Sequence, residues 1–103
     1  MTKVYVKENN NIIKEITISG HSNNDVKGKD IVCSSISSIV TTTINALIRL
    51  DEEAISYTEK DGFININNIK NEPNTQILID NMLNLLKELA TKYPKNIQVK
   101  RGN

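Results

Sequence analysis

Short stretches in which apolar and polar residues alternate open the chain and predict a β-hairpin. Val4 to Lys7 and Ile12 to Ser19 are rich in β-branched residues, and Glu8 to Asn11 between them is polar turn material. Gly20 ends the second predicted strand. A polar loop with a glycine near each end then continues to Asp30. The chain is therefore expected to begin with two paired strands and a loop.

A helical period replaces the alternation after this loop. Between Ile31 and Arg49 the apolar positions recur at spacings of three and four, which predicts an amphipathic helix. The expected buried face consists of Ile36, Ile39, Val40, Thr43, Leu47 and Leu50. Asp30 is the expected N-cap, because its side-chain oxygen accepts hydrogen bonds from amides of the first turn. Serine, threonine and isoleucine are abundant here and are poor helix formers, so packing has to stabilise this helix.

A second hairpin and a second helix are predicted in the rest of the chain. Ile55 to Glu59 and Phe63 to Ile69 flank an Asp-Gly turn, which is a strong hairpin signal. A helix is expected over Asn74 to Lys92, before Pro94, and a last strand over Ile97 to Lys100. The apolar face of this helix is expected to consist of Leu78, Met82, Leu85, Leu86 and Leu89.

These elements predict an α+β fold in the order ββαββαβ, with two helices packed on one face of a sheet. The length of 103 residues suits one compact domain spanning residues 1–103.

Charge and composition exclude several classes of function. The formal net charge is +1, and the chain has one phenylalanine, three tyrosines and no tryptophan, so no direct contact with nucleic acid is expected. No secretory signal is recognised at the amino terminus, and no stretch is expected to reach the length of about 18 apolar residues that a membrane helix needs. The expectation is a cytoplasmic protein without a membrane partner.

The chain has a single histidine, His21, and a single cysteine, Cys33. A zinc site needs three or four protein ligands, so these two residues cannot build one alone, and neither a metal nor a cofactor is expected. One cysteine forms no internal disulfide. In a reducing compartment it persists as a thiol.

Nucleophilic catalysis is the sharper interpretation of this pair. Cys33 falls in the first turn of the predicted helix, where the helix dipole favours a thiolate and where amides are available to bind an oxyanion. His21 lies at the end of a predicted strand, across the loop, as a candidate base. A buried structural cysteine and a solvated histidine explain the same positions. The residue pattern alone leaves these alternatives open.

A resemblance to a known family bears on this choice. Gly20-His21, then Gly28-Lys29-Asp30-Ile31-Val32-Cys33, then Ser37 resembles the signature of the ribosomal-processing cysteine proteases, labelled Prp. The resemblance implies that Cys33 is the nucleophile and His21 its general base. Gly20, Gly28, Asp30 and Ser37 are then supporting motif members. The chain departs from the family at Ser22, Ser34 and Ser35, where small apolar residues are common.

The resemblance also implies a substrate and a partner. Enzymes of this family remove an N-terminal extension from a precursor of a large-subunit ribosomal protein, the twenty-seventh in the bacterial series, and they form homodimers. Two other functions remain open from the residues: a non-catalytic ribosome-associated binding module with a reactive thiol, and a redox-sensing thiol.

Overall fold

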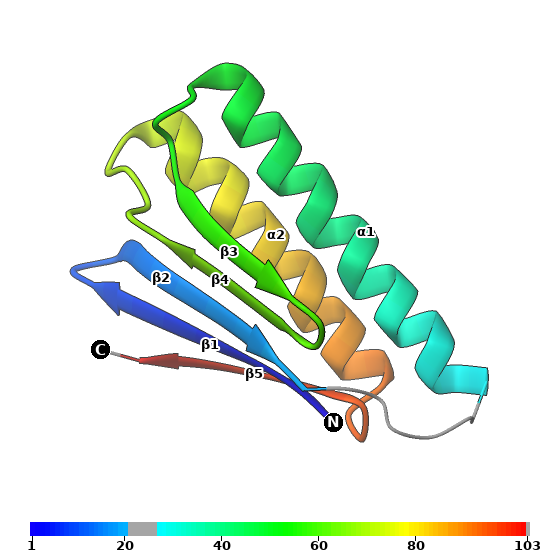
Figure 1. Cartoon of the computed structure of the whole chain (residues 1–103). Helices are drawn as coiled ribbons and strands as arrows, with labels where there is room; N and C mark the ends of the chain where they lie inside the picture. Colours follow the sequence, from blue (N-terminus) through cyan, green and yellow to red (C-terminus); the bar gives the residue numbers. More distant parts are fainter. Residues whose placement is uncertain (21–26, 103) are drawn as a thin grey trace.

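The predicted order of elements, ββαββαβ, is confirmed. The computed structural model describes residues 1–20 and 27–102. The elements are β1 (Thr2–Asn9), β2 (Ile12–Ser19), α1 (Lys27–Leu50), β3 (Ser56–Lys60), β4 (Phe63–Asn67), α2 (Pro73–Lys92) and β5 (Ile97–Gly102). Figure 1 shows them as two layers, with both helices on one side of a sheet. The structure is the expected α+β domain.

The sheet has the strand order β3-β4-β2-β1-β5. Both hairpins are antiparallel, β2 pairs with β4, and β5 returns to lie parallel to β1 at the edge. Because a parallel pair needs a crossover, α2 carries the chain over the face of the sheet before β5 begins (Figure 1). The first strand of the chain therefore lies inside the sheet, between β2 and β5.

The turn between β1 and β2 consists of Asn10 and Asn11, both with positive φ, at 52° and 66°. A two-residue hairpin turn with both residues in this region matches the twist of the strands, and asparagine tolerates it well. The pairing then shifts, because Lys7 lies opposite Glu15 while Glu8 lies opposite Ile13. The extra residue on β2 is a β-bulge next to the turn.

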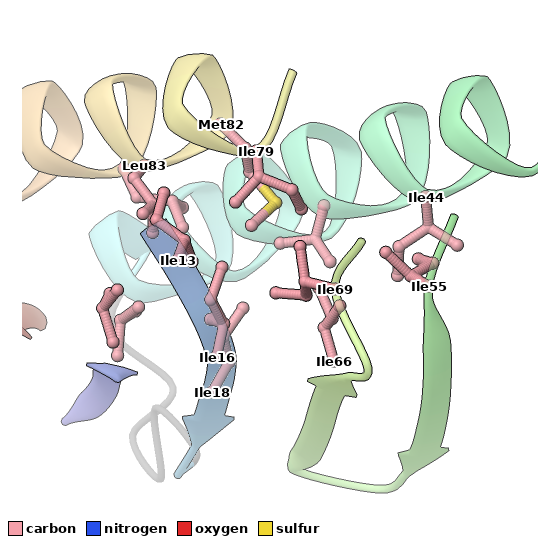
Figure 2. Close-up of a cluster of buried hydrophobic side chains, with 14 of the residues drawn as sticks. Ile13, Ile16, Ile18, Ile44, Ile55, Ile66, Ile69, Ile79, Met82 and Leu83 are labelled. Carbon is pink, nitrogen blue, oxygen red and sulfur yellow. The ribbon is translucent and has the colours of Figure 1, made fainter. Parts of the chain in front are cut away.

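The core fills the space between the sheet and the helices (Figure 2). Isoleucines of β2 and β4 point toward α1 and α2, as Ile16 and Ile66 do with no exposed surface. The expected helix faces need a partial correction. Leu50 and Leu85 are 65% and 41% exposed, whereas Ile79 and Leu83 are fully buried. The buried face of α2 therefore differs in part from the predicted one, because this helix contacts both the sheet and α1.

The helix α1 also corrects the expectation about membrane spans. By length and composition, the stretch Ile31–Leu50 is apolar enough to cross a membrane, although one such helix is weak evidence because core helices pass the same test. Here the apolar face is buried, at Val32, Val40 and Leu47 for example. The exposed residues of the helix include many hydroxyl side chains: Ser34, Ser37, Ser38, Thr41 and Thr42. This two-sided composition is typical of a helix that packs on a sheet.

Candidate active site

Cys33 lies on α1 with its side chain half-buried. It does not lie in the first turn, because the helix begins at Lys27 and not near Ile31. Only the first four amides of a helix lack a partner within the helix, so those amides lie nearly a turn before Cys33. The expectation that they surround Cys33 and bind an oxyanion there is wrong.

The same shift corrects the role expected for Asp30. This residue and Gly28 lie inside α1, so Asp30 is not the N-cap. The sequence around them has no apolar period, which is why the helix was expected to begin later. Lysine and aspartate nevertheless tolerate a helical backbone near an N-terminus, and one glycine costs only about 1 kcal/mol there.

A cavity of about 540 Å³ lies beside Cys33. Three parts of the chain surround it: the start of β1 with the end of β2, the N-terminal half of α1, and the turn between β3 and β4. Figure 1 shows these parts at one end of the molecule. The lining residues are Thr2, Ile18, Gly20, Cys33, Ile36, Ser37, Glu59, Lys60, Asp61, Gly62, Phe63 and Ile64. The volume is in the range of cavities that hold small ligands or side chains.

The lining is apolar in one part and charged in another. Ile18 and Ile36 are buried core residues, and the ring of Phe63 is 37% exposed. Glu59, Lys60 and Asp61 bring both signs of charge to the hairpin side. A thiol in a cavity lined by both apolar and charged side chains suits the binding of a ligand that carries apolar and polar groups.

Three of the expected motif residues meet in this cavity. Gly20 and Ser37 line it together with Cys33, and Ser37 lies one helical turn after the cysteine. Gly28 and Asp30 lie within α1. His21 lies outside the described residues. The structure thus brings Gly20, Cys33 and Ser37 together.

Gly20 is required for its backbone shape. Its φ is +114°, and a Cβ atom built on it would lie 2.3 Å from the carbonyl oxygen of Met1. Its amide donates a hydrogen bond to the carbonyl oxygen of Gly62 at 3.0 Å. This contact joins the end of β2 to the turn of the second hairpin. Only glycine fits this position without displacing the end of β2 or the turn of the second hairpin.

The sequence pattern did not point to the hairpin residues of the site. Lys60, Asp61 and Phe63 are far from Cys33 in the chain, and their Asp-Gly turn was predicted only as a connection. No local pattern places this turn at the cavity that Cys33 lines. Among the described residues, no group of three or more histidine, cysteine or carboxylate side chains could hold a metal ion.

Comparison with known proteins decides the family. The sequence pattern of the family described as "Cysteine protease Prp" matches residues 1–98. The chain belongs to this family. The predicted resemblance to this family is thereby confirmed, and the chain is a cysteine protease, a hydrolase, whose relatives include a ribosomal processing cysteine protease.

Relatives of known sequence and structure agree with this assignment. The ribosomal processing cysteine protease Prp of Staphylococcus aureus strain Mu50 is 28% identical over 90 residues, which are 84% of this chain and 85% of that protein. The crystal structure of S. aureus Prp with a covalently linked product peptide has a TM-score of 0.89 at 25% identity, covering 99% of this chain and 100% of that one. SMU.848 from Streptococcus mutans has a TM-score of 0.86 at 26% identity, over 98% of this chain and 93% of that one.

Proposed function

We propose that Cys33 is the nucleophile of this Prp protease and that His21 is its general base. The cavity beside Cys33 is the observation that carries the proposal, because it gives the thiol access to a bound chain. The cysteine is also the chain's single cysteine, so an acyl-enzyme of a cysteine protease has no other site. Gly20 supports the dyad by holding the chain next to His21 against the second hairpin.

The proposed reaction has two steps. The thiolate of Cys33 attacks the carbonyl carbon of the scissile bond, and His21 gives its proton to the leaving amine, so that a thioester forms and the peptide bond breaks. His21 then takes a proton from water, the hydroxide attacks the thioester, and the thiolate of Cys33 leaves beside the protonated His21, while the new carboxylic acid loses its proton to solvent. No metal or cofactor takes part in this scheme.

The proposed substrate is the precursor of the large-subunit ribosomal protein that is twenty-seventh in the bacterial series, cleaved after its N-terminal extension. Two observations support a peptide substrate. Structures of S. aureus Prp contain a substrate peptide or a covalently linked product peptide. The apolar wall formed by Ile18, Ile36 and Phe63 also suits a hydrophobic extension, because burial of one apolar side chain contributes about 1.5 to 3 kcal/mol.

The test is cleavage of a synthetic peptide that covers the extension junction, with products identified by mass. Cys33→Ala and His21→Ala are each expected to lower the cleavage rate by at least about 10⁴-fold, as loss of a nucleophile or base does in other proteases. Ser34→Ala is the matched control, because this exposed serine follows Cys33 but lines a different surface. It is expected to cleave normally.

Cys33→Ala is also expected to bind the uncut peptide, measured by calorimetry, and to unfold at the same urea concentration as the parent. Cleavage at the normal rate by folded Cys33→Ala would reject the nucleophile. Normal cleavage of an unrelated peptide, with none at the extension junction, would reject only the substrate.

A homodimer in the cytoplasm completes the proposal. The groove between the helices supports a dimer, because Leu85 is 41% exposed there beside small serine side chains that allow close approach. Light scattering is expected to give twice the chain mass of 11.6 kDa, and Leu85→Glu to reduce it toward the monomer. Ile77→Glu, at a more exposed apolar residue of the same helix outside this groove, is the control.

A further inference from the structure

The face of the sheet opposite the helices carries a repeated pattern on β1. Val4 and Val6 are buried under the helices, whereas Lys3, Tyr5 and Lys7 alternate with them and are exposed. Successive side chains of a strand point to opposite faces, so these three lie on the outer face. Figure 1 shows both helices on the other side. Within residues 1–20 and 27–102, no helix or strand covers this face.

An aromatic ring is thus placed between ammonium groups. Along β1, the Cα atoms of Lys3 and Lys7 are about 13 Å apart, at about 3.3 Å for each of four steps, with Tyr5 at the midpoint. Lys100 of the neighbouring strand β5 is the register partner of Tyr5. Adjacent strands are about 4.8 Å apart, so Lys100 lies next to the ring. The tyrosine has lysines on three sides.

The surface around Tyr5 is hollowed. A depression of about 340 Å³ is lined by Tyr5, Val6, Lys7, Glu15, Thr17, Lys100, Arg101 and Gly102. Tyr5 is 42% exposed, so part of its ring is available to a ligand. A depression lined by an aromatic ring and ammonium groups has the composition of sites that bind single strands by stacking and by phosphate contacts.

The charge of this face differs from that of the whole chain. Glu15 is the carboxylate among the residues of the depression, and its Oε2 accepts a hydrogen bond from Nδ2 of Asn65 at 3.1 Å. It lies opposite Lys7 in the register and compensates one of the lysines. Lys3 and Lys100 remain in excess. A formal net charge of +1 therefore conceals a local excess of positive charge on the outer face.

We propose that this outer face binds a single-stranded nucleic acid, with a base stacked on Tyr5 and phosphates on Lys3, Lys7 and Lys100. The net charge of the chain favours the opposite expectation, whereas the local charge of this face favours binding. A lipid surface fits the face less well, since the lysines surround one tyrosine ring, and Phe63, which the register places on the same face, lies two strands away. An acidic peptide would use the lysines and leave the ring without a role.

The first experiment measures anisotropy of labelled twelve-nucleotide oligo(U) RNA and oligo(dT) DNA over a range of salt concentrations. The triple variant Lys3→Gln, Lys7→Gln, Lys100→Gln is expected to bind at least tenfold more weakly, with the salt slope reduced by about 2, at about 0.7 for each phosphate contact on a single strand. Lys87→Gln, Lys92→Gln, Lys95→Gln removes the same charge outside the outer face and is expected to bind normally. The tighter of the two strands identifies the natural class of nucleic acid.

The second experiment tests the ring. Tyr5→Leu is expected to weaken binding about tenfold, whereas Tyr5→Phe retains it, because stacking needs the ring and not the hydroxyl. Equal weakening by the control triple, or unchanged binding by Tyr5→Leu, would overturn the proposal. Polyglutamate or phosphatidylserine vesicles that bind as tightly as RNA would overturn it too. Cleavage of the free substrate peptide is expected to be normal in all these variants, which separates this proposal from that of the protease site.

Discussion

At the scale of single residues, the backbone geometry of Gly20 shapes the site of this protease. Gly20 connects three segments: strand β2, which ends one residue before it, the first residue of the chain, and the hairpin turn at Gly62. A side chain at this position meets backbone atoms, which cannot rotate away. Gly20 lines the cavity beside Cys33, so the shape of the cavity wall depends on the absence of a Cβ atom at residue 20.

Gly20→Ala is expected to destabilise the fold by more than about 1 kcal/mol, because alanine at positive φ is strained and its Cβ would lie 2.3 Å from the oxygen of Met1. Peptide cleavage is expected to fall as well, because His21 is the next residue. Urea unfolding and the cleavage assay measure the two effects. Gly102→Ala has nothing within 4 Å of the added atom and is the matched control. Equal stability of both variants would contradict the argument.

At the scale of elements, the two helices begin in different ways. α1 begins before any apolar period is visible in the sequence. α2 begins at a defined cap, where the Glu72 carboxylate accepts hydrogen bonds from the amides of Asn74 and Thr75 at 3.2 and 3.0 Å. Thr75 is buried and also donates its hydroxyl to Glu72. The stability of the N-terminal turn of α2 therefore depends on the ionisation of the Glu72 carboxyl group.

The hydrogen bonds from the amides of Thr75 and Asn74 lower the pKa of Glu72 below its ordinary value of 4.5. A lowered pKa in the folded state stabilises the fold above pH 4.5, and this contribution is lost as the pH falls through the folded value. Glu72→Gln is expected to be less stable than the parent at neutral pH, with the difference shrinking in acid. Urea unfolding between pH 3 and 7 measures it. Glu88→Gln, on the same helix outside the cap, is the control. A difference in stability between Glu72→Gln and the parent that stays constant from pH 3 to 7 would contradict the role of the ionised cap.

At the scale of the whole molecule, one polar side chain joins the two layers at the β-bulge. The amide of Gln76 on α2 accepts from the backbone N–H of Ile13 at 2.9 Å and donates to its carbonyl oxygen at 3.0 Å. It also donates to the carbonyl oxygen of Lys70 at 3.2 Å. The side chain thus replaces a neighbouring strand where the pairing of β2 with β4 has not yet begun, since that register starts at Ile16.

Gln76→Ala is expected to lower the free energy of unfolding by about 1 to 3 kcal/mol, the usual cost of leaving partly buried backbone groups without partners. The loss occurs even though alanine favours helices, so local propensity predicts the opposite sign. Asn81→Ala, at an exposed position of the same helix, is the control. Urea unfolding compares the two. If Gln76→Ala is as stable as Asn81→Ala, the hydrogen bonds of Gln76 do not stabilise the contact between the two layers.

The sequence by itself determined the number, order and type of elements. Periods of two and of 3.6 residues mark strands and helices, and the hairpin turns carry their own signals in Asn10-Asn11 and Asp61-Gly62. It also selected Gly20, Cys33 and Ser37, which the fold brings to one cavity. Such features are local, because each depends on residues close together in the chain.

The tertiary structure alone decided what surrounds Cys33 and what faces solvent. No local pattern shows that the turn at Asp61 lines the same cavity as Cys33, that α1 begins before Gly28, or that Tyr5 lies opposite Lys100. Each of these facts depends on how strands far apart in the chain are ordered and registered in the sheet. Side chains alternate along a strand, but only the placement of both helices on one side of the sheet leaves Lys3 and Tyr5 on the uncovered face.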